Sequence, residues 1–233
     1  MEFQDDVAPG LDPARARMTD EEFRSFERAL ERYDLDLVTQ KLRPGVTVFI
    51  AAHPARLKNG MLARALASVN AQTKQPEAIA VVNDTERKGA GWTRRTLLDL
   101  VQTEWIAWLD SDDEWLPEHL AKLTEVAAAT DSVFVYSWFH GNDPLKHFGL
   151  PFDPCHPHHT TMNVLVRTDI AKRVGFNDSQ PPPYSNEDWG FITGVAAICC
   201  AEGLKMTHLP EKTWHYHQQG QNTSGQPTQG DAR

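Results

Sequence analysis

The chain has 233 residues, 40% of them hydrophobic and 24% charged, which is the balance of a soluble globular protein. Its formal net charge of −9 argues against non-specific binding to nucleic acid through a basic surface. No apolar run approaches the roughly 18 residues of a membrane span, and residues 1–6 are acidic and lack the apolar core of a signal peptide. We therefore expect one substantial soluble domain located in the cytoplasm.

The two ends of the chain differ in composition from its middle. Residues 1–45 are expected to form an N-terminal extension with one amphipathic helix, whose start at Thr19 followed by Glu22 is a capping-box pattern. Residues 218–233 are rich in Gln, Gly, Thr and Ser, and a poorly ordered polar tail is expected there. Residues 46–217 are left as the main domain.

The main domain alternates apolar runs of strand character with segments of helical periodicity. Strands are predicted at residues 46–52, 78–82, 105–109 and 132–138, and helices at residues 61–71, 93–102 and 117–129. The run from Val46 to Ala52 is short and rich in β-branched residues, which is typical of a parallel strand buried on both faces. This alternation predicts an α/β sheet flanked by helices, with right-handed crossovers.

The three cysteines are Cys155, Cys199 and Cys200, too few and too unevenly spaced to predict a disulfide framework. Cys199 and Cys200 are expected on a helix, where a thiol packs as a small apolar group. Residues 155–159 hold one cysteine and three histidines, but their spacing matches no closed zinc site. Zinc is therefore only a minor alternative for this stretch.

Polar side chains follow three successive predicted strands at the point where each strand ends. They are His53, Asp84 and the run Asp110–Asp113. In open α/β sheets, ligands bind in the crevice outside the carboxyl ends of the strands. The sequence therefore predicts a ligand site at this edge of the sheet.

The run Asp110-Ser111-Asp112-Asp113 brings three carboxylates together directly after a buried strand. Gathering like charges costs free energy unless a cation neutralises them, and a hard divalent ion prefers carboxylate and phosphate oxygens. Such an ion can hold a diphosphate and stabilise its charge as it leaves. The alternative is that Asp112 or Asp113 only caps the helix that follows near Pro117.

Several segments together resemble the family-two glycosyltransferases of the GT-A fold. The resembling segments are "VTVFIAAHPARLKNGMLARALASVNAQT", "AIAVVNDT", "EWIAWLDSDDEWLPEHLAKL", "NVLVRTDIAKRVGFND", "NEDWGF" and "TWHYHQQGQNTSG", which cover residues 46 to about 225 in the family's usual order. The resemblance implies a GT-A (Rossmann-like) nucleotide-diphospho-sugar transferase fold with a mixed sheet. It also implies a metal-dependent inverting glycosyltransferase that moves a sugar from a UDP- or GDP-linked donor to a hydroxyl acceptor.

The resemblance assigns nucleotide contacts to the first half of the chain. Ala52 and His53 would lie near the nucleoside, and Asp84 would accept a hydrogen bond from the base. Arg94 or Arg95 would help to hold nucleotide or phosphate, although a solvated helix face is the alternative for both. Asn83 stands where the family commonly has a second acid, which leaves the identity of the donor base open.

The acidic run and a late histidine pair would hold the metal and the donor. Asp110 and Asp112 match the two acids of the family's DxD motif, so Asp110 would face the ribose and Asp112 would bind the metal. The side chains of His215 and His217 point the same way in an extended segment. His217, directly before Gln218-Gln219-Gly220, is the preferred further ligand, and His215 is the second choice. Mn²⁺ suits an imidazole ligand better than Mg²⁺, which remains possible. Two ordinary surface histidines are the alternative.

The second half of the chain would serve the acceptor. Glu187 and Asp188 match the family's acidic pair, in which Asp188 would be the catalytic base. The alternative is that residues 186–188 cap the helix that follows. The Pro-rich stretch 151–159 is expected as a loop over the acceptor cleft, with His158 or His159 near sugar or phosphate, or else as an ordinary surface loop.

Two other functions remain open at this stage. A nucleotidyltransferase also uses an α/β sheet and paired acids, but it would normally carry a Gly-rich, Arg/Lys-containing loop after the first strand, which this sequence lacks. A nucleotide-sugar-binding module without catalysis would keep the same donor residues. The acceptor is not readable and could be a protein, a modified nucleic acid, a small glycan or a metabolite.

Overall fold

The computed structural model describes residues 42–52, 59–141, 146–176 and 187–217, all of which belong to one compact unit that begins at Leu42. The predicted N-terminal helix, His53 and the polar tail lie outside the described residues. The first strand begins at Arg43, slightly before its predicted start at residue 46. The boundaries predicted for the extension and the tail stay predictions.

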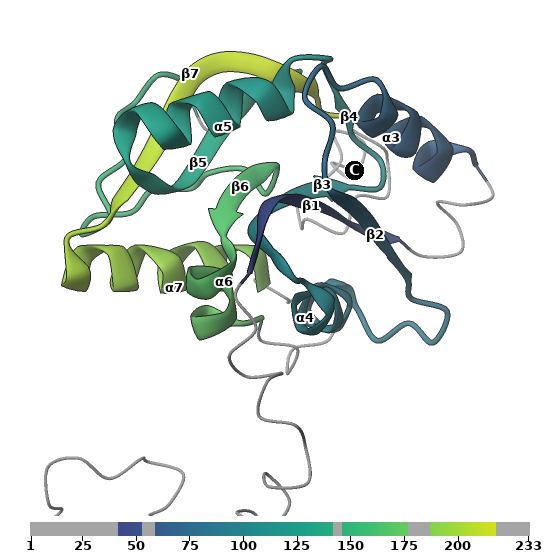
Figure 1. Cartoon of the computed structure of the whole chain (residues 1–233), viewed down its shortest axis with the longest axis horizontal. Helices are drawn as coiled ribbons and strands as arrows, with labels where there is room; N and C mark the ends of the chain where they lie inside the picture. Colours follow the sequence, from purple (N-terminus) through teal and green to yellow (C-terminus); the bar gives the residue numbers. More distant parts are fainter. Residues whose placement is uncertain (1–41, 53–58, 142–145, 177–186, 218–233) are drawn as a thin grey trace, which may run out of the picture. The chain divides into compact units, whose positions relative to one another are not determined.

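The sheet has seven strands in the order β2-β1-β3-β6-β5-β7-β4 (Figure 1). Strands β2, β1 and β3 are mutually parallel, as are β5 and β7, whereas β6 and β4 run antiparallel to their neighbours. The sheet is therefore mixed, as predicted. The bounds are β1 Arg43–Ala52, β2 Ala78–Asn83, β3 Thr103–Asp110, β4 Glu114–Trp115, β5 Ser132–His140, β6 Val164–Arg167 and β7 Lys205–His215.

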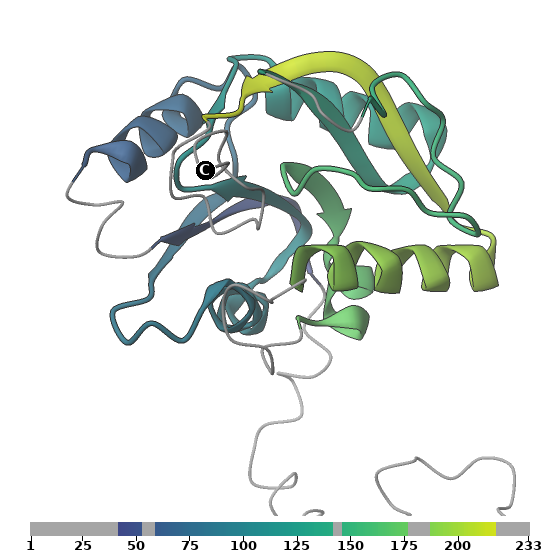
Figure 2. The ribbon, with the colours of Figure 1, turned by 180° about the vertical axis from the view of Figure 1, so that it is seen from behind.

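The helices cover both faces of the sheet. Helices α3 and α5 lie on one face, and α4, α6 and α7 on the other (Figures 1 and 2). Their bounds are α3 Met61–Asn70, α4 Ala90–Leu100, α5 His119–Thr130, α6 Thr168–Val174 and α7 Glu187–Glu202. Among these described helices, none has the length and apolar character needed to cross a bilayer. The four predicted strands and three predicted helices are all confirmed, with shifts of up to three residues at their ends.

An aromatic cluster in the core fixes β3 against the helices of one face. Trp108 of β3 makes edge contacts with Phe49 of β1 at 5.0 Å and with Phe176 at 5.2 Å between ring centroids. Phe176 in turn stacks on Phe191 of α7 at 4.3 Å. Because each such pair adds about 0.5–1.5 kcal/mol beyond the area it buries, the cluster holds the end of β3 and the start of α7 in a fixed relation.

The register of the parallel strands brings their carboxyl ends to one edge. Ala52 of β1 pairs with Asn83 of β2, and Ala51 pairs with Asp110 of β3. The backbone N–H of Asp84 donates to the carbonyl of Ala52 at 2.8 Å, which joins the two strand ends. The predicted edge is therefore formed, with Asp84 and Asp110 on either side of the end of β1.

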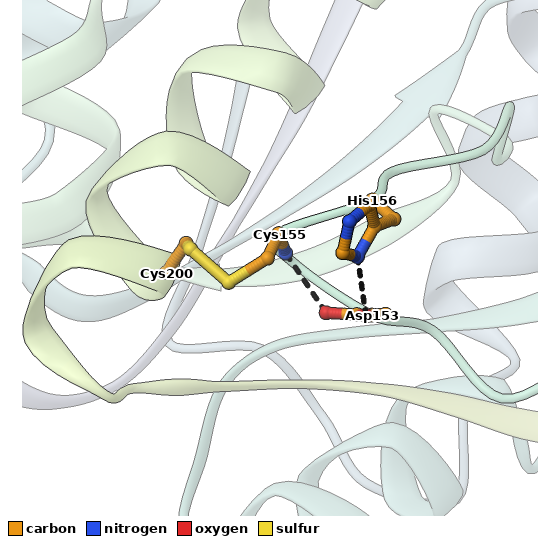
Figure 3. Close-up of a disulfide and its surroundings, with 4 residues drawn as sticks. All are labelled: Asp153, Cys155, His156 and Cys200. Atoms are coloured by element: carbon orange, nitrogen blue, oxygen red, sulfur yellow. Dashed lines mark hydrogen bonds and ion pairs between the residues drawn. A yellow bond between two sulfur atoms is a disulfide. The ribbon is translucent and has the colours of Figure 1, made fainter.

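Cys155 and Cys200 form a disulfide, so the expectation that Cys200 packs on its helix as a small apolar thiol was wrong (Figure 3). The pairing joins the loop between β5 and β6 to the C-terminal part of α7, across 45 residues and with 5.1 Å between the Cα atoms. Spacing along the chain carries no information about such a contact. The bonded sulfur is also unavailable as a zinc ligand, and the neighbouring His156 pairs with Asp153 at 2.9 Å instead.

Helices α6 and α7 approach each other closely at Gly194. A Cβ at this position would lie 2.5 Å from Cγ1 of Val174, a β-branched side chain that cannot easily turn away. At Gly190, also on α7, a Cβ would meet no described heavy atom within 4 Å. A side chain can therefore be added at Gly190 without a clash but not at Gly194.

We predict that Gly194→Ala lowers the free energy of unfolding by about 1–3 kcal/mol, because the added methyl group overpacks the α6–α7 contact. Gly190→Ala is the matched control and should be neutral or stabilising by up to about 1 kcal/mol, since Ala is the better helix former. Urea unfolding of the two variants measures both values. Equal effects of the two substitutions would show that the close contact does not determine stability.

Candidate functional site

The acidic run forms a tight turn between β3 and β4. The N–H of Asp113 donates to the carbonyl of Asp110 at 3.0 Å, which reverses the chain after β3. Strand β4 then pairs with β7, and Glu114 lies opposite His215. The two predicted parts of the site, the acidic turn and the late histidines, are thus brought together by this short antiparallel pairing.

Asp113 is buried beneath the turn, with 2% of its surface exposed. Its Oδ2 accepts a hydrogen bond from Asn163 Nδ2 at 3.0 Å, and its Oδ1 accepts one from the backbone N–H of His217 at 3.3 Å. Burial, reinforced by the charges of Asp110 and Asp112, raises the pKa of Asp113 well above its ordinary value. Asp113 therefore ties the turn to the strand segments behind it.

The interpretation of Asp113 as a helix cap was wrong. Helix α5 begins at His119, after Glu118, and the first-turn N–H of Leu120 donates to Gln72 Oε1 at 2.9 Å rather than to an aspartate of the acidic run. The sequence offered a short acidic residue just ahead of a helix, which is the usual pattern of a cap. The tertiary contact with Asn163 prevails because a buried carboxylate needs hydrogen-bond donors.

A polar layer behind Asp113 was missed by the sequence analysis. Asn163 Oδ1 accepts a hydrogen bond from the Trp115 indole N–H at 2.9 Å, and the Trp115 ring stacks on His119 at 4.4 Å. His119 Nδ1 lies 2.6 Å from the Thr213 hydroxyl, and burial lowers the pKa of His119 to about 3, so the ring is neutral at pH 7. The only sign of this layer in the sequence was Asn163, a polar residue directly before the apolar run that forms β6.

Arg94 lies buried between two carboxylates, with 5% of its surface exposed. Its Nη2 is 2.7 Å from Asp110 Oδ1, and its Nη1 is 2.9 Å from Glu187 Oε1. Burial opposes the charged form, but the neighbouring carboxylates outweigh it and raise the pKa of Arg94. The alternative of a solvated helix face is therefore wrong for Arg94, whereas Arg95 is exposed.

Asp84 organises the loop that leads into α4. Its Oδ1 accepts the backbone N–H of Lys88 at 2.8 Å, and its Oδ2 accepts that of Gly89 at 2.7 Å. Each carboxylate oxygen has a second lone pair, so these bonds leave acceptor capacity for a further donor. Ala52 is buried beside it, with 4% of its surface exposed. The contact of Asp84 with a nucleotide base stays a prediction.

The donor set around the acidic turn fits a divalent ion only in part. His217 Nε2 is buried without a hydrogen-bond partner among the described residues, and it lies 3.5 Å from Glu114 Oε2. Within the same residues, no group of three His, Cys, Asp or Glu side chains is arranged to hold a metal by itself. A carboxylate such as Asp112 and one imidazole would therefore need further oxygen ligands from a bound molecule, as is usual for ions that bridge to phosphates.

The second acidic pair begins α7 at the other side of the site. Asp188 is exposed, and its Oδ1 accepts the backbone N–H of Trp189 at 2.7 Å. The ring of His159 stacks on that of Trp189 at 4.1 Å, which brings the predicted acceptor loop beside Asp188. The same residue can therefore bond to the first turn of the helix and present a carboxylate to solvent.

The comparisons with known proteins agree on one family. Residues 65–177 match the family described as "Glycosyl transferase family 2". The succinoglycan biosynthesis protein ExoW of Rhizobium meliloti (strain 1021) is 32% identical over 39% of this chain and 37% of its own length.

The solved structures with the same architecture are distant in sequence. Residues 1–349 of S. aureus TarS, in complex with UDP-GlcNAc, superpose with a TM-score of 0.64 at 15% identity, covering 78% of this chain and 61% of that one. The mannosyltransferase PcManGT of Pyrobaculum calidifontis, in complex with GDP-Man and Mn²⁺, gives 0.54 at 14% identity, with coverages of 81% and 62%. The chain thus spans less than two thirds of the length of each of these relatives.

We predict that Asn163→Leu lowers the free energy of unfolding by about 2–4 kcal/mol at pH 7, because the buried Asp113 carboxylate loses its Asn163 donor and the Trp115 N–H loses its Asn163 acceptor. The loss should shrink as the pH falls, since a protonated Asp113 carries no buried charge. Urea unfolding at several pH values measures this dependence. Asn83→Leu, at an exposed asparagine, is the control and should change stability by less than about 0.5 kcal/mol. A loss that is the same at every pH would exclude the carboxylate as its cause.

Proposed function

Because the chain belongs to glycosyl transferase family 2 and has the mixed sheet of the GT-A glycosyltransferases, we propose that it transfers a sugar from a nucleoside-diphosphate sugar to a hydroxyl acceptor. The reaction would be an inverting single displacement that requires a divalent metal. The observation that carries the proposal is the convergence of Asp110, the acidic turn and the Glu187–Asp188 pair at one edge of the sheet, joined by Arg94.

The donor would lie across the ends of β1, β2 and β3. Asp84, beside Ala52, would accept a hydrogen bond from the base, and Asp110 would face the ribose. TarS has been solved with UDP-GlcNAc and PcManGT with GDP-Man, so either a UDP- or a GDP-linked sugar remains a candidate here. Arg95 is exposed on α4 and is the arginine that remains accessible to the donor.

Asp112 and His217 would hold the metal together with the donor's diphosphate oxygens. The support is the buried Nε2 of His217, which has no hydrogen-bond partner among the described residues, and the backbone bond that fixes His217 against Asp113. Mn²⁺ is the preferred ion because one ligand is an imidazole, and PcManGT has been solved with Mn²⁺. When bound, the ion would neutralise charge on the departing diphosphate.

Asp188 would act as the catalytic base. Its exposed carboxylate would take the proton of the acceptor hydroxyl as that oxygen attacks the anomeric carbon and the bond to the nucleoside diphosphate breaks. An oxocarbenium-like transition state is expected, as in other glycosyl transfers. His159, stacked on Trp189, would border the acceptor on the same side.

We predict that Asp188→Asn lowers sugar transfer by about 10²–10⁴-fold while nucleotide binding stays nearly intact, because only proton removal is lost. Release of sugar from UDP- and GDP-sugars in the presence of Mn²⁺ measures activity, and calorimetry measures nucleotide binding. Asp99→Asn, at an exposed carboxylate on α4, is the control. A parallel loss of binding and activity would make Asp188 structural.

The same assay separates the two other candidate functions. Turnover of a nucleoside triphosphate with a sugar phosphate would indicate a nucleotidyltransferase. Tight binding of nucleoside diphosphate by the wild-type protein without any turnover would indicate an inert binding module.

Removal of the metal tests the ligand assignment. We predict that Mn²⁺ strengthens nucleoside-diphosphate binding at least about tenfold, and that EDTA or His217→Ala abolishes this gain while His215→Ala preserves most of it. A thermal-shift titration with and without Mn²⁺ measures the change, because a ligand stabilises the fold in proportion to its affinity. Loss of the gain in His215→Ala alone would reassign the ligand to His215.

A further inference from the structure

We propose that Arg94 is a positioning residue that fixes the first turn of α7, and with it Asp188, against the end of β3. This inference rests on the proposed function, in which β3 serves the donor and α7 serves the acceptor. It replaces the expectation that Arg94 contacts the nucleotide. The role of Arg94 would be to set the distance between the donor site at the end of β3 and the Asp188 carboxylate at the start of α7.

Arg94 and its two ion-pair partners lie on three different elements. The arginine lies on α4, Asp110 ends β3 and Glu187 begins α7. The two Nη atoms donate to different carboxylates, at 2.7 Å and 2.9 Å. A guanidinium is planar and keeps its donors in a fixed geometry, so it holds its two partners at a defined separation.

Burial leaves the two ion pairs of Arg94 little screened by water and leaves little of its side chain open to a ligand. The side chain of Arg94 is 7% exposed and that of Glu187 is 10% exposed, whereas Asp110 remains 37% exposed. Ion pairs removed from water are little screened, and losing one partner leaves the other as an uncompensated buried charge. Asp110 is therefore the member of this bridge that stays accessible to a donor.

The apolar surroundings support the same geometry. The Arg94 guanidinium carbon lies 6.0 Å from the centroid of the Phe176 ring, and Phe176 stacks on Phe191, one helical turn beyond Glu187. The arginine is thus held both by its ion pairs and by the aromatic layer on which α7 rests. A change at position 94 should loosen the first turn of α7 before it disturbs the sheet.

The position of Asp188 follows directly from that of Glu187, its neighbour in the chain. Asp188 also contributes to the electrostatic stabilisation of the Arg94 charge. A displacement of about 1 Å in a catalytic group can cost roughly 10²-fold in rate. Loss of Arg94 should therefore lower kcat through the base and leave donor affinity largely unchanged.

The test compares Arg94→Met, Arg94→Lys, Glu187→Gln and the double variant Arg94→Met/Glu187→Gln. We expect Arg94→Met to lower kcat about ten- to a hundredfold, with donor KM within about twofold of the wild type. Arg94→Lys should recover part of kcat because it restores the charge. The double variant should be no worse than Arg94→Met, because it removes the buried charge together with its partner.

Hydrogen exchange provides a readout that needs no substrate. Amides of residues 187–192 should exchange faster in Arg94→Met than in the wild type, and Arg94→Lys should restore part of the protection. Arg173→Met is the matched control, since Arg173 pairs with Glu202 at the exposed, opposite end of α7. This substitution should leave exchange in residues 187–192 unchanged.

Two outcomes would overturn the proposal. A donor KM raised tenfold or more with kcat unchanged would make Arg94 a nucleotide contact. Unaltered exchange of residues 187–192 in Arg94→Met would show that Arg94 does not position α7. The exchange result is independent of turnover, so a failure of the proposed transferase activity would be recognised separately by an inactive wild-type protein. If Arg94→Met does not fold, the double variant and Arg94→Lys carry the same comparison.

Discussion

The structure depends on how negative charge is distributed at one edge of the sheet. Several carboxylates gather there, and like charges repel one another without a countercharge. They include Asp110, Asp112, Asp113, Glu187 and Asp188. Burial raises the pKa of Asp113, while the guanidinium of Arg94 compensates Asp110 and Glu187. Asp188 stays exposed, as its proposed role of taking a proton from an acceptor requires.

The fold could be predicted because its signals are local. The β-branched run ending at Ala52 and the apolar run ending at Asp110 each identify a buried strand without reference to the rest of the chain. Parallel strands then place their carboxyl ends together, and the observed register opposite Ala51 and Ala52 confirms this edge. Family motifs also depend on residue types at known places along the chain, and they drew attention to the acidic turn and the Glu187–Asp188 pair, whose roles stay predictions.

What could not be predicted is which polar groups meet across the fold. Asp113 and His217 are 104 residues apart, and Arg94 and Glu187 are 93 residues apart. A short motif identifies a carboxylate but not its hydrogen-bond donors, so a helix cap was an open alternative for Asp113, and the two carboxylate partners of Arg94 could not be foreseen. Asn163 was missed because a single asparagine before an apolar strand forms no periodic pattern that would mark it as buried. The roles of Asp84, His215 and His217 toward a donor stay predictions.

The disulfide bears on the question of which cell compartment the protein occupies. Such bonds persist in oxidising compartments and are rare in the cytoplasm, so the cytoplasmic location expected from the sequence stays a prediction that the Cys155–Cys200 bond speaks against. The third thiol, Cys199, is buried, and burial raises its pKa to about 11. At neutral pH it is almost never a thiolate, which is the form that attacks disulfides. The Cys155–Cys200 bond therefore does not exchange readily with Cys199. Because Cys155 and Cys200 are both exposed, thiols in the surrounding solution can reach the bond and reduce it.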